Sequence, residues 1–253
     1  MRDDVRMTEV THYGPDCPLR VEHPVMYHRW EMLTFLHWSY DPETVQRLLP
    51  KSLTVETFDG RAWVGLVPFY MRVNAPGIPR LPWISNFCET NVRTYARDER
   101  GQPGVWFFSL DATRFPAVAA ARLGFRLPYM WSRMQLQRDG DSVTYTTRRS
   151  WPRPTVASRV RIEIGAPFAP AGLTERDHFL TARWRLFSVG GAAGRWRRYA
   201  DAQHDPWPLR RAKVLELDDN LVAAAGLPQP VDSPLVHYSP GVGVRIGLPH
   251  RYR

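Results

Sequence analysis

The chain has little cysteine and no long apolar run. Its 253 residues include only Cys17 and Cys88 as cysteines, which fit no metal or redox motif and are too few for a disulfide framework. No stretch approaches the roughly 18 consecutive apolar residues of a membrane helix, and the polar residues 1–20 lack the apolar centre of a signal peptide. We therefore expect a soluble cytoplasmic protein without a membrane partner.

The strong catalytic and cofactor-binding motifs are absent as well. The sequence has no phosphate-binding loop, dinucleotide fingerprint, zinc-protease motif or serine-hydrolase elbow. The eight histidines are scattered singly, so their spacing predicts no metal site. We therefore expect no metal and no cofactor, and look to the fold and to polar clusters for function.

Lysine is scarce although the chain is strongly basic. The net charge of +9 comes almost entirely from arginine, because Lys51 and Lys213 are the only lysines. The arginines are spread along the chain and accompany no zinc-finger, helix-turn-helix or RNA-binding motif. A solvated basic face is therefore the preferred interpretation, and a nucleic-acid partner is not expected.

The residues that are present are typical of a β-rich globular domain. Hydrophobic residues make up 43% of the chain, and the 23 prolines and ten tryptophans favour strands and turns over long helices. About ten strand-like segments and two or three short helices suggest a closed or strongly coiled sheet of the α+β, β-rich class. No linker or repeat divides the chain, so we expect one domain over residues 1–253 with an irregular leader over residues 1–25.

Several local elements can be predicted from sequence signals. Asp41 and Pro42 have the residue types of a helix N-cap and first helical position. The Asp59-Gly60 and Asp139-Gly140 pairs predict hairpin turns. Further expectations are strands over residues 32–40, 53–59, 61–73 and 181–189 and a short alanine-rich helix over residues 115–125.

The best polar cluster alternates along one predicted strand. Glu89, Asn91 and Arg93 should share a face because strand side chains alternate. If that face is exposed, the three residues are an ordinary solvated stripe. If it is buried, a charged pair and an amide lie in a low-dielectric interior, which marks a site. His37, in an apolar strand, is better interpreted as a core histidine than as a catalyst.

Two long segments resemble acetoacetate decarboxylases: FPAVAAARLGFRLPYMWSRM (residues 115–134) and DPETVQRLLPKSLTVE (residues 41–56). The closer resemblance is to the YqjF-like branch of that superfamily, whose function is unknown. It is carried by runs such as QRLLPKSLTVETFDGRAWVGLVPFYM (residues 46–71) and GVWFFSLDA (residues 104–112), in an ordered set that spans residues 32–238. The resemblance implies an acetoacetate-decarboxylase-like antiparallel β-barrel or cone with a few short helices.

The resemblance also implies a site. It places the nucleophilic lysine of the decarboxylases at Tyr129, and tyrosine cannot form the Schiff base that a primary amine forms. Classical decarboxylation is therefore not expected. What the resemblance implies instead is an internal cavity with Tyr129, Glu89 and Arg93 as candidate catalytic residues. The candidate ligand-binding residues are Asn91, His37, Arg133, Trp131 and Trp106.

Two functions remain open at this stage. The first is an enzyme on a small keto acid, carboxylate or polyketide-like molecule, in which Glu89 or Tyr129 transfers a proton and Arg93 binds a carboxylate or enolate. Tyr129 would then need a lowered pKa, which Arg93 or Arg133 could supply. The second is a non-catalytic binder of a lipophilic ligand, which would be lined by aromatic residues without a perturbed acid or base: Trp63, Trp106, Phe108 and Trp131. A homo-oligomer is compatible with both, since the decarboxylases assemble.

Overall fold

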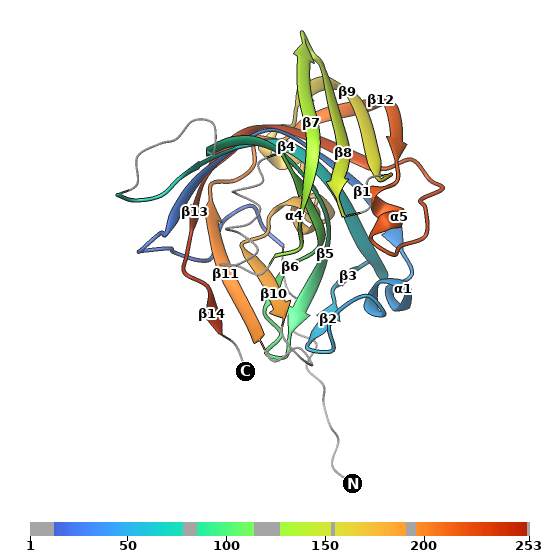
Figure 1. Ribbon diagram of the computed structural model, residues 1–253. Coiled ribbons are helices and arrows are strands. Elements are labelled where there is room, and N and C mark those ends of the chain that lie inside the picture. Colours follow the sequence, from blue (N-terminus) through green and yellow to red (C-terminus); the bar gives the residue numbers. More distant parts are fainter. Residues whose placement is uncertain (1–12, 78–84, 114–126, 153–154, 191–195, 252–253) are drawn as a thin grey trace.

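The computed structural model describes residues 13–77, 85–113, 127–152, 155–190 and 196–251 (Figure 1). Strands dominate it, and the helices are short. The helical elements are α1 (Pro42–Gln46), a 3-10 turn (Pro170–Gly172), α4 (Glu175–Thr181) and α5 (Leu221–Ala224). The strands are β1 (Met26–Tyr40), β2 (Leu53–Val55), β3 (Thr57–Phe58), β4 (Arg61–Asn74), β5 (Asn86–Asp98), β6 (Pro103–Ala112), β7 (Tyr129–Asp139), β8 (Ser142–Trp151), β9 (Ala157–Pro167), β10 (Arg185–Gly190), β11 (Trp196–His204), β12 (Arg210–Asp219), β13 (Leu235–Ile246) and β14 (His250–Arg251). Within these ranges no helix is both long and apolar enough to cross a bilayer.

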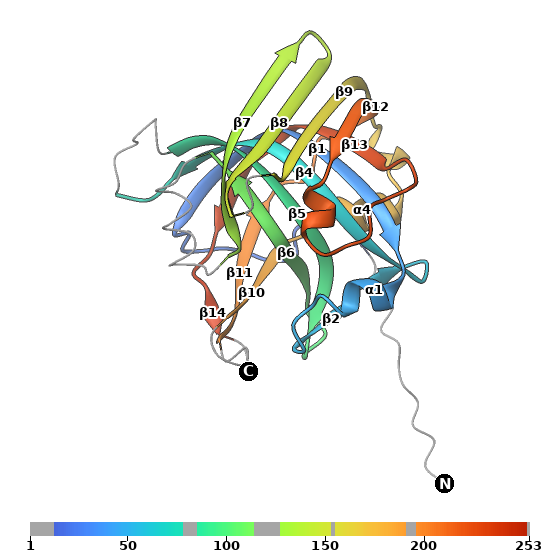
Figure 2. The same cartoon turned by 45° about the vertical axis from the view of Figure 1, so that its right-hand side comes forward.

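The sheet closes on itself. Strands β6-β7-β8-β9-β12-β13-β1-β4-β5 follow one another, and β5 pairs with β6 to complete a nine-stranded barrel. Pairings β6–β10, β10–β11 and β11–β13 close a second circuit that shares β13, β1, β4, β5 and β6 with the first. In Figure 2, β7, β8, β9 and β12 lie at the top of the view and β10 and β11 below. The expected β-barrel with few short helices is confirmed, although β6 pairs in parallel with β7 and with β10.

The shared strands are buried on both faces. Burial is unbroken over residues 33–38 of β1, 62–69 of β4 and 89–96 of β5. Because strand side chains alternate, each circuit receives one face of these strands. Leu36, Leu66 and Val92 pack with residues of β8 and β9, while the alternate side chains pack with residues of β7, β11 and the segment around Trp207. Polar residues on either face are therefore placed in the interior.

Most short-range sequence signals are confirmed. The Asp41 side chain accepts a hydrogen bond from the Thr44 amide and so caps α1. Asp59 and Gly60 both have positive φ, as a tight turn between β3 and β4 requires, and Gly140 has positive φ between β7 and β8.

Three boundaries were predicted wrongly, the first being the start of β1, which lies at Met26 and not at residue 32. Residues 53–59 do not form one strand, because Glu56 separates β2 from β3. The strand expected over residues 181–189 begins at Arg185, since the preceding residues belong to α4 and its end. A capping box between Thr174 and Asp177 starts that helix and outweighs the strand propensity that follows it. The helix expected over residues 115–125 lies outside the described residues.

Candidate functional site

Strand β5 carries a polar row into the interior. Glu89, Asn91 and Arg93 have exposed fractions of 2%, 4% and 9%. They lie opposite Phe69, Val67 and Gly65 of β4, respectively. The predicted common face is thus buried, and the solvated-stripe reading of these three residues is wrong.

Two neutral polar side chains favour the ionised form of the Glu89 carboxyl group. The Tyr129 hydroxyl, at the start of β7, donates to Glu89 Oε2 at 2.9 Å. The Asn91 side chain, on the same face of β5, also lowers the pKa of Glu89. Burial raises the pKa of Glu89 to about 8, against the smaller opposing effect of these side chains. Near neutral pH this is an uncharged acid that titrates in the range useful for proton transfer.

The tyrosine at the decarboxylase lysine position is not activated. Burial and the neighbouring Glu89 raise the pKa of Tyr129 well above its ordinary value. The expectation that an arginine lowers this pKa is therefore wrong. Arg133 is exposed on β7, and Arg93 donates to other groups. Tyr129 acts here as a neutral donor to Glu89.

Arg93 is a buried cation that bonds to neutral oxygens. Its Nη2 donates to the Leu180 carbonyl at 3.1 Å and to the Tyr95 hydroxyl at 3.3 Å. The guanidinium also lies over the Phe35 ring, 5.3 Å from the centroid. Its Nε has no hydrogen-bond partner, and none of the ion pairs of the described residues joins Arg93 to Glu89 or to another carboxylate. A buried charge of this kind is costly unless an anion compensates it.

His37 lies beside Arg93 over a glycine. A Cβ at Gly65 would lie only 2.8 Å from His37 Nε2, so the glycine leaves room for the imidazole. His37 Nε2 is 2.6 Å from the Tyr95 hydroxyl oxygen, and that hydroxyl donates its single proton to the Leu180 carbonyl. His37 Nε2 must therefore be the donor in its pair with Tyr95. Burial and Arg93 lower the pKa of His37 well below its ordinary value, so the ring is neutral.

Side chains bind the carbonyl groups at the end of α4. The Phe179 carbonyl accepts from Arg183 Nε at 2.7 Å, and the Thr181 carbonyl accepts from Trp207 Nε1 at 2.8 Å. The Leu180 carbonyl between them accepts from Arg93 and Tyr95. A helix end leaves such acceptors without intrahelical partners, and here they fix α4 against the polar row of β5.

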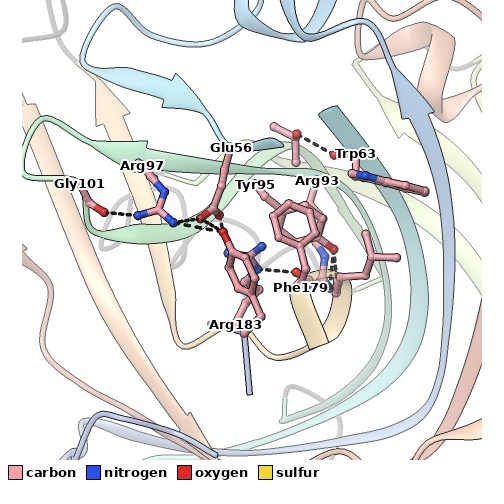
Figure 3. A network of polar contacts seen from close by, with 11 residues as sticks. Glu56, Trp63, Arg93, Tyr95, Arg97, Gly101, Phe179 and Arg183 are labelled. Atoms are coloured by element: carbon pink, nitrogen blue, oxygen red, sulfur yellow. Dashed lines mark hydrogen bonds and ion pairs between the residues drawn. The ribbon is translucent and has the colours of Figure 1, made fainter. Parts of the chain in front are cut away.

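A second polar network anchors the same helix from the side (Figure 3). Buried Glu56 lies 2.5 Å from Arg183 Nη1 and 2.7 Å from Arg97 Nη2, and it accepts from the Tyr13 hydroxyl at 2.6 Å. Figure 3 shows Arg183 between Glu56 and Phe179. The Glu56 carboxylate is paired with two arginines and a hydroxyl group, so we interpret this network as structural.

Sequence reasoning missed several residues around the site. Tyr95 could have been found, because it continues the alternation of Glu89, Asn91 and Arg93 along β5. The spacing of Thr174 and Asp177 is a capping-box signal for α4. Three others had no local signal because they reach the helix only through the tertiary fold: Arg183, Trp207 and His237.

Three predicted ligand-binding residues are not brought to the Glu89 group. Trp131, with 39% of its surface exposed, and Arg133 both lie on the solvent side of β7. Trp106 is partly buried in a separate apolar cluster with Leu53 and Phe187. The described residues also contain no group of three or more histidine, cysteine or acidic side chains placed to hold a metal ion.

Comparisons with known proteins agree on family and fold. The DUF2071 family, described as an uncharacterized conserved protein, matches residues 27–243. The uncharacterized protein YqjF of Bacillus subtilis (strain 168) is 34% identical over 220 residues, which cover 85% of this chain and 87% of that protein.

Solved structures with the same fold are much more distant in sequence. An acetoacetate decarboxylase-like enzyme from Sphingomonas wittichii RW1 is 14% identical with a TM-score of 0.63, over 91% of this chain and 94% of that one. The enduracididine biosynthesis enzyme MppR, complexed with pyruvate, is 13% identical with a TM-score of 0.65, over 95% of this chain and 98% of that one. With its strand-rich barrel and this match over most of its length, the chain belongs to the DUF2071 family of YqjF-like proteins, which has the acetoacetate decarboxylase-like fold.

Proposed function

We propose that this chain binds a small keto acid or related carboxylate and transfers a proton to or from it, with Glu89 as the proton-transferring group. The observation that carries this proposal is the buried carboxyl of Glu89, held by Tyr129, on the strand face that also carries Asn91 and Arg93. Roughly 13 Å of strand separates the Cα atoms of residues 89 and 93. The long Arg93 side chain and a ligand of a few carbons would span that interval.

Each group has a distinct role in the proposed reaction. Arg93 supplies positive charge to a carboxylate or to a developing enolate oxygen. Glu89, once ionised, accepts a proton from the carbon next to the carbonyl and returns it to the same carbon. Tyr129 orients the carboxyl group of Glu89 through its hydrogen bond.

Schiff-base chemistry is not part of this proposal. The two lysines, Lys51 and Lys213, are both exposed, and Tyr129 has no amine. Enolisation by a carboxylate base needs no amine, because the electron pair of the broken C–H bond is delocalised onto the carbonyl oxygen.

Relatives and site chemistry both favour a keto acid over a lipophilic ligand. MppR, which shares the fold, binds pyruvate, and a second MppR complex holds the condensation product of pyruvate and imidazole 4-carboxaldehyde. Aromatic rings do lie nearby, as Trp207 packs edge-on against Phe35 at 5.1 Å. A passive apolar site, however, has no use for a buried acid with a pKa near 8 or for a buried arginine. We also propose that this protein is cytoplasmic.

Exchange of the methyl protons of pyruvate in D₂O, followed by proton NMR, tests the proposal. Wild-type protein should accelerate exchange over buffer, and the rate should rise with pH and level off above about 8 as Glu89 ionises. Glu89→Gln should lower the catalysed rate by about 100-fold or more. Glu163→Gln, an exposed glutamate on β9, is the matched control and should exchange like wild type. Undiminished exchange by Glu89→Gln, or no acceleration by wild type, would contradict the proposal.

A further inference from the structure

We propose that His37 and His237 form a hydrogen-bonding edge of the site, which selects keto acids bearing a hydroxyl group beyond the carbonyl. This inference rests on the proposed function and names the substrate class more narrowly. It starts from two buried histidines, 1% and 5% exposed, that each use one ring nitrogen to hold α4 and leave the other without a partner among the described residues.

The unused nitrogen of His37 is an acceptor. Its Nε2 carries the proton given to Tyr95, because the Tyr95 hydroxyl donates to the Leu180 carbonyl. In a neutral ring the other nitrogen, Nδ1, then holds a lone pair. It is buried and has no hydrogen-bond partner among the described residues.

His237 on β13 also leaves one ring nitrogen unused. Its Nε2 lies 3.0 Å from Asp177 Oδ1, and the histidine and the Thr174 hydrogen bonds hold the pKa of Asp177 well below its ordinary value. An ionised carboxylate only accepts hydrogen bonds, so His237 Nε2 is the donor. The other ring nitrogen, Nδ1, is buried without a described partner.

The register places the two rings on one face. Phe35 of β1 pairs with His237, and His37 pairs with Leu235, so the two histidines are diagonal neighbours, roughly 7–8 Å apart. Phe35 lies between them, nearly parallel to the His37 ring, with the Arg93 guanidinium above it. Two ring nitrogens without a described partner thus belong to the strand face on which the cation that would hold the carboxylate lies over Phe35.

The charge around His37 decides which kind of hydrogen-bond donor a ligand can bring to it. Burial lowers the pKa of His37 most, and Arg93, His237 and Arg183 lower it further, so the region is electropositive and disfavours an ammonium group. A hydroxyl group donates a hydrogen bond without adding charge. Because a buried acceptor left unpaired weakens binding, a keto acid with a hydroxyl should bind better than one without it.

Binding of pyruvate and of 3-hydroxypyruvate to the full chain, measured by isothermal titration calorimetry, tests this selection. Glutamine can keep an amide donor near the position of the histidine Nε2, so His37→Gln and His237→Gln remove Nδ1 while allowing the bonds to Tyr95 and Asp177. Wild type should prefer 3-hydroxypyruvate by about tenfold, and at least one glutamine variant should bring the preference to about twofold or less. His250→Gln, in exposed β14, is the control and should keep the wild-type preference.

The outcomes separate this inference from the proposed function. A lost preference with unchanged pyruvate affinity supports the acceptor role, since damage to the fold would weaken both ligands. Equal affinities in wild type, or a preference that survives in both glutamine variants, would overturn the inference while leaving keto-acid binding intact. If neither keto acid binds to wild type, the proposed function fails and this inference fails with it.

Discussion

A glycine sets how closely the side chains of the site can approach one another. Gly65 of β4 pairs with His37 on one side and with Arg93 on the other. A Cβ there would lie 2.8 Å from His37 Nε2 and 3.5 Å from Arg93 Cγ. The absent side chain is therefore what allows the imidazole and the arginine stem to lie over the same point of the sheet.

We expect Gly65→Ala to destabilise the protein by about 1–3 kcal/mol, because the methyl group displaces His37 from Tyr95. Urea unfolding measures the change. Gly243→Ala on β13 is the matched control, since a Cβ there meets nothing within 4 Å, and it should be neutral or slightly stabilising. Equal effects of the two substitutions would show that crowding at His37 does not limit the site.

Single-residue properties were predictable only where they are local. The alternation of Glu89, Asn91 and Arg93 follows from strand geometry, and the sequence was enough to place them on one face. The pKa direction of Tyr129 was not predictable, because it depends on burial and on Glu89, a residue 40 positions away in the chain. Likewise, Arg133 and Trp131 could not be distinguished from inward residues before the face of β7 was known.

At the scale of elements, α4 is held mainly by side chains of other elements. Its last carbonyls accept from Arg183, Arg93, Tyr95 and Trp207, and Asp177 on the helix accepts from His237 of β13. The helix has seven residues and would be marginal alone. The position of α4 against β5 therefore depends on these buried hydrogen bonds.

We expect Tyr95→Phe to cost about 1–3 kcal/mol, because the Leu180 carbonyl and His37 each lose a partner. Tyr238→Phe is the control, since the buried Tyr238 hydroxyl has no described partner and its removal should be neutral or stabilising. Urea unfolding of the two variants makes the comparison. A Tyr95→Phe protein as stable as wild type would mean that the helix is fixed by packing alone.

Prediction of the elements succeeded where turn and cap chemistry marks the chain. Asp41, Asp59-Gly60 and Asp139-Gly140 correctly marked a helix start and two hairpins. The missed helix α4 precedes an aromatic, strand-like run, so propensity favoured a strand that begins at residue 181. Hydrogen bonds from other elements to the end of the helix favour the helix instead of the strand. No local sequence window contains these partners.

At the scale of the whole molecule, a buried ion pair joins strands across the nine-stranded barrel. Arg149 of β8 donates to both carboxylate oxygens of Asp111 on β6, at 2.8 and 2.7 Å. Ser132 of β7, the strand between them, donates to the same carboxylate at 2.6 Å. This cluster lies on the opposite face of the shared strands from Glu89. Its three side chains hydrogen-bond to one another, so we interpret the cluster as structural.

We expect Arg149→Met to destabilise the protein by about 3–5 kcal/mol, because it leaves the Asp111 carboxylate buried without its cation. The double variant Asp111→Leu/Arg149→Met should recover most of that loss. Arg159→Met, which breaks the exposed pair with Glu216, should cost less than about 1 kcal/mol. Chemical unfolding measures the stability of all three variants. A small loss of stability in Arg149→Met would argue against an ionised buried pair.

The overall architecture was predictable in part. Composition and turn spacing indicated few helices and a closed sheet, but about ten strands were expected and the described residues form fourteen. Two features did not follow from local patterns: the second circuit through β10 and β11 and the parallel pairings of β6. They arise from contacts between segments far apart in sequence, and they create the doubly buried strands on which Glu89 and Arg93 lie.

The central claim is that Glu89 is a buried acid that titrates near physiological pH. Carbon NMR of protein labelled at the glutamate carboxyl carbons follows it directly, with Glu89→Gln identifying the resonance. We predict a titration midpoint near pH 8, because burial outweighs the opposing effects of Tyr129 and Asn91 on the pKa of Glu89. A midpoint between about pH 4 and 5, the ordinary range for glutamate, would show that the carboxyl is already ionised near neutral pH and would contradict its role as a tuned acid and base.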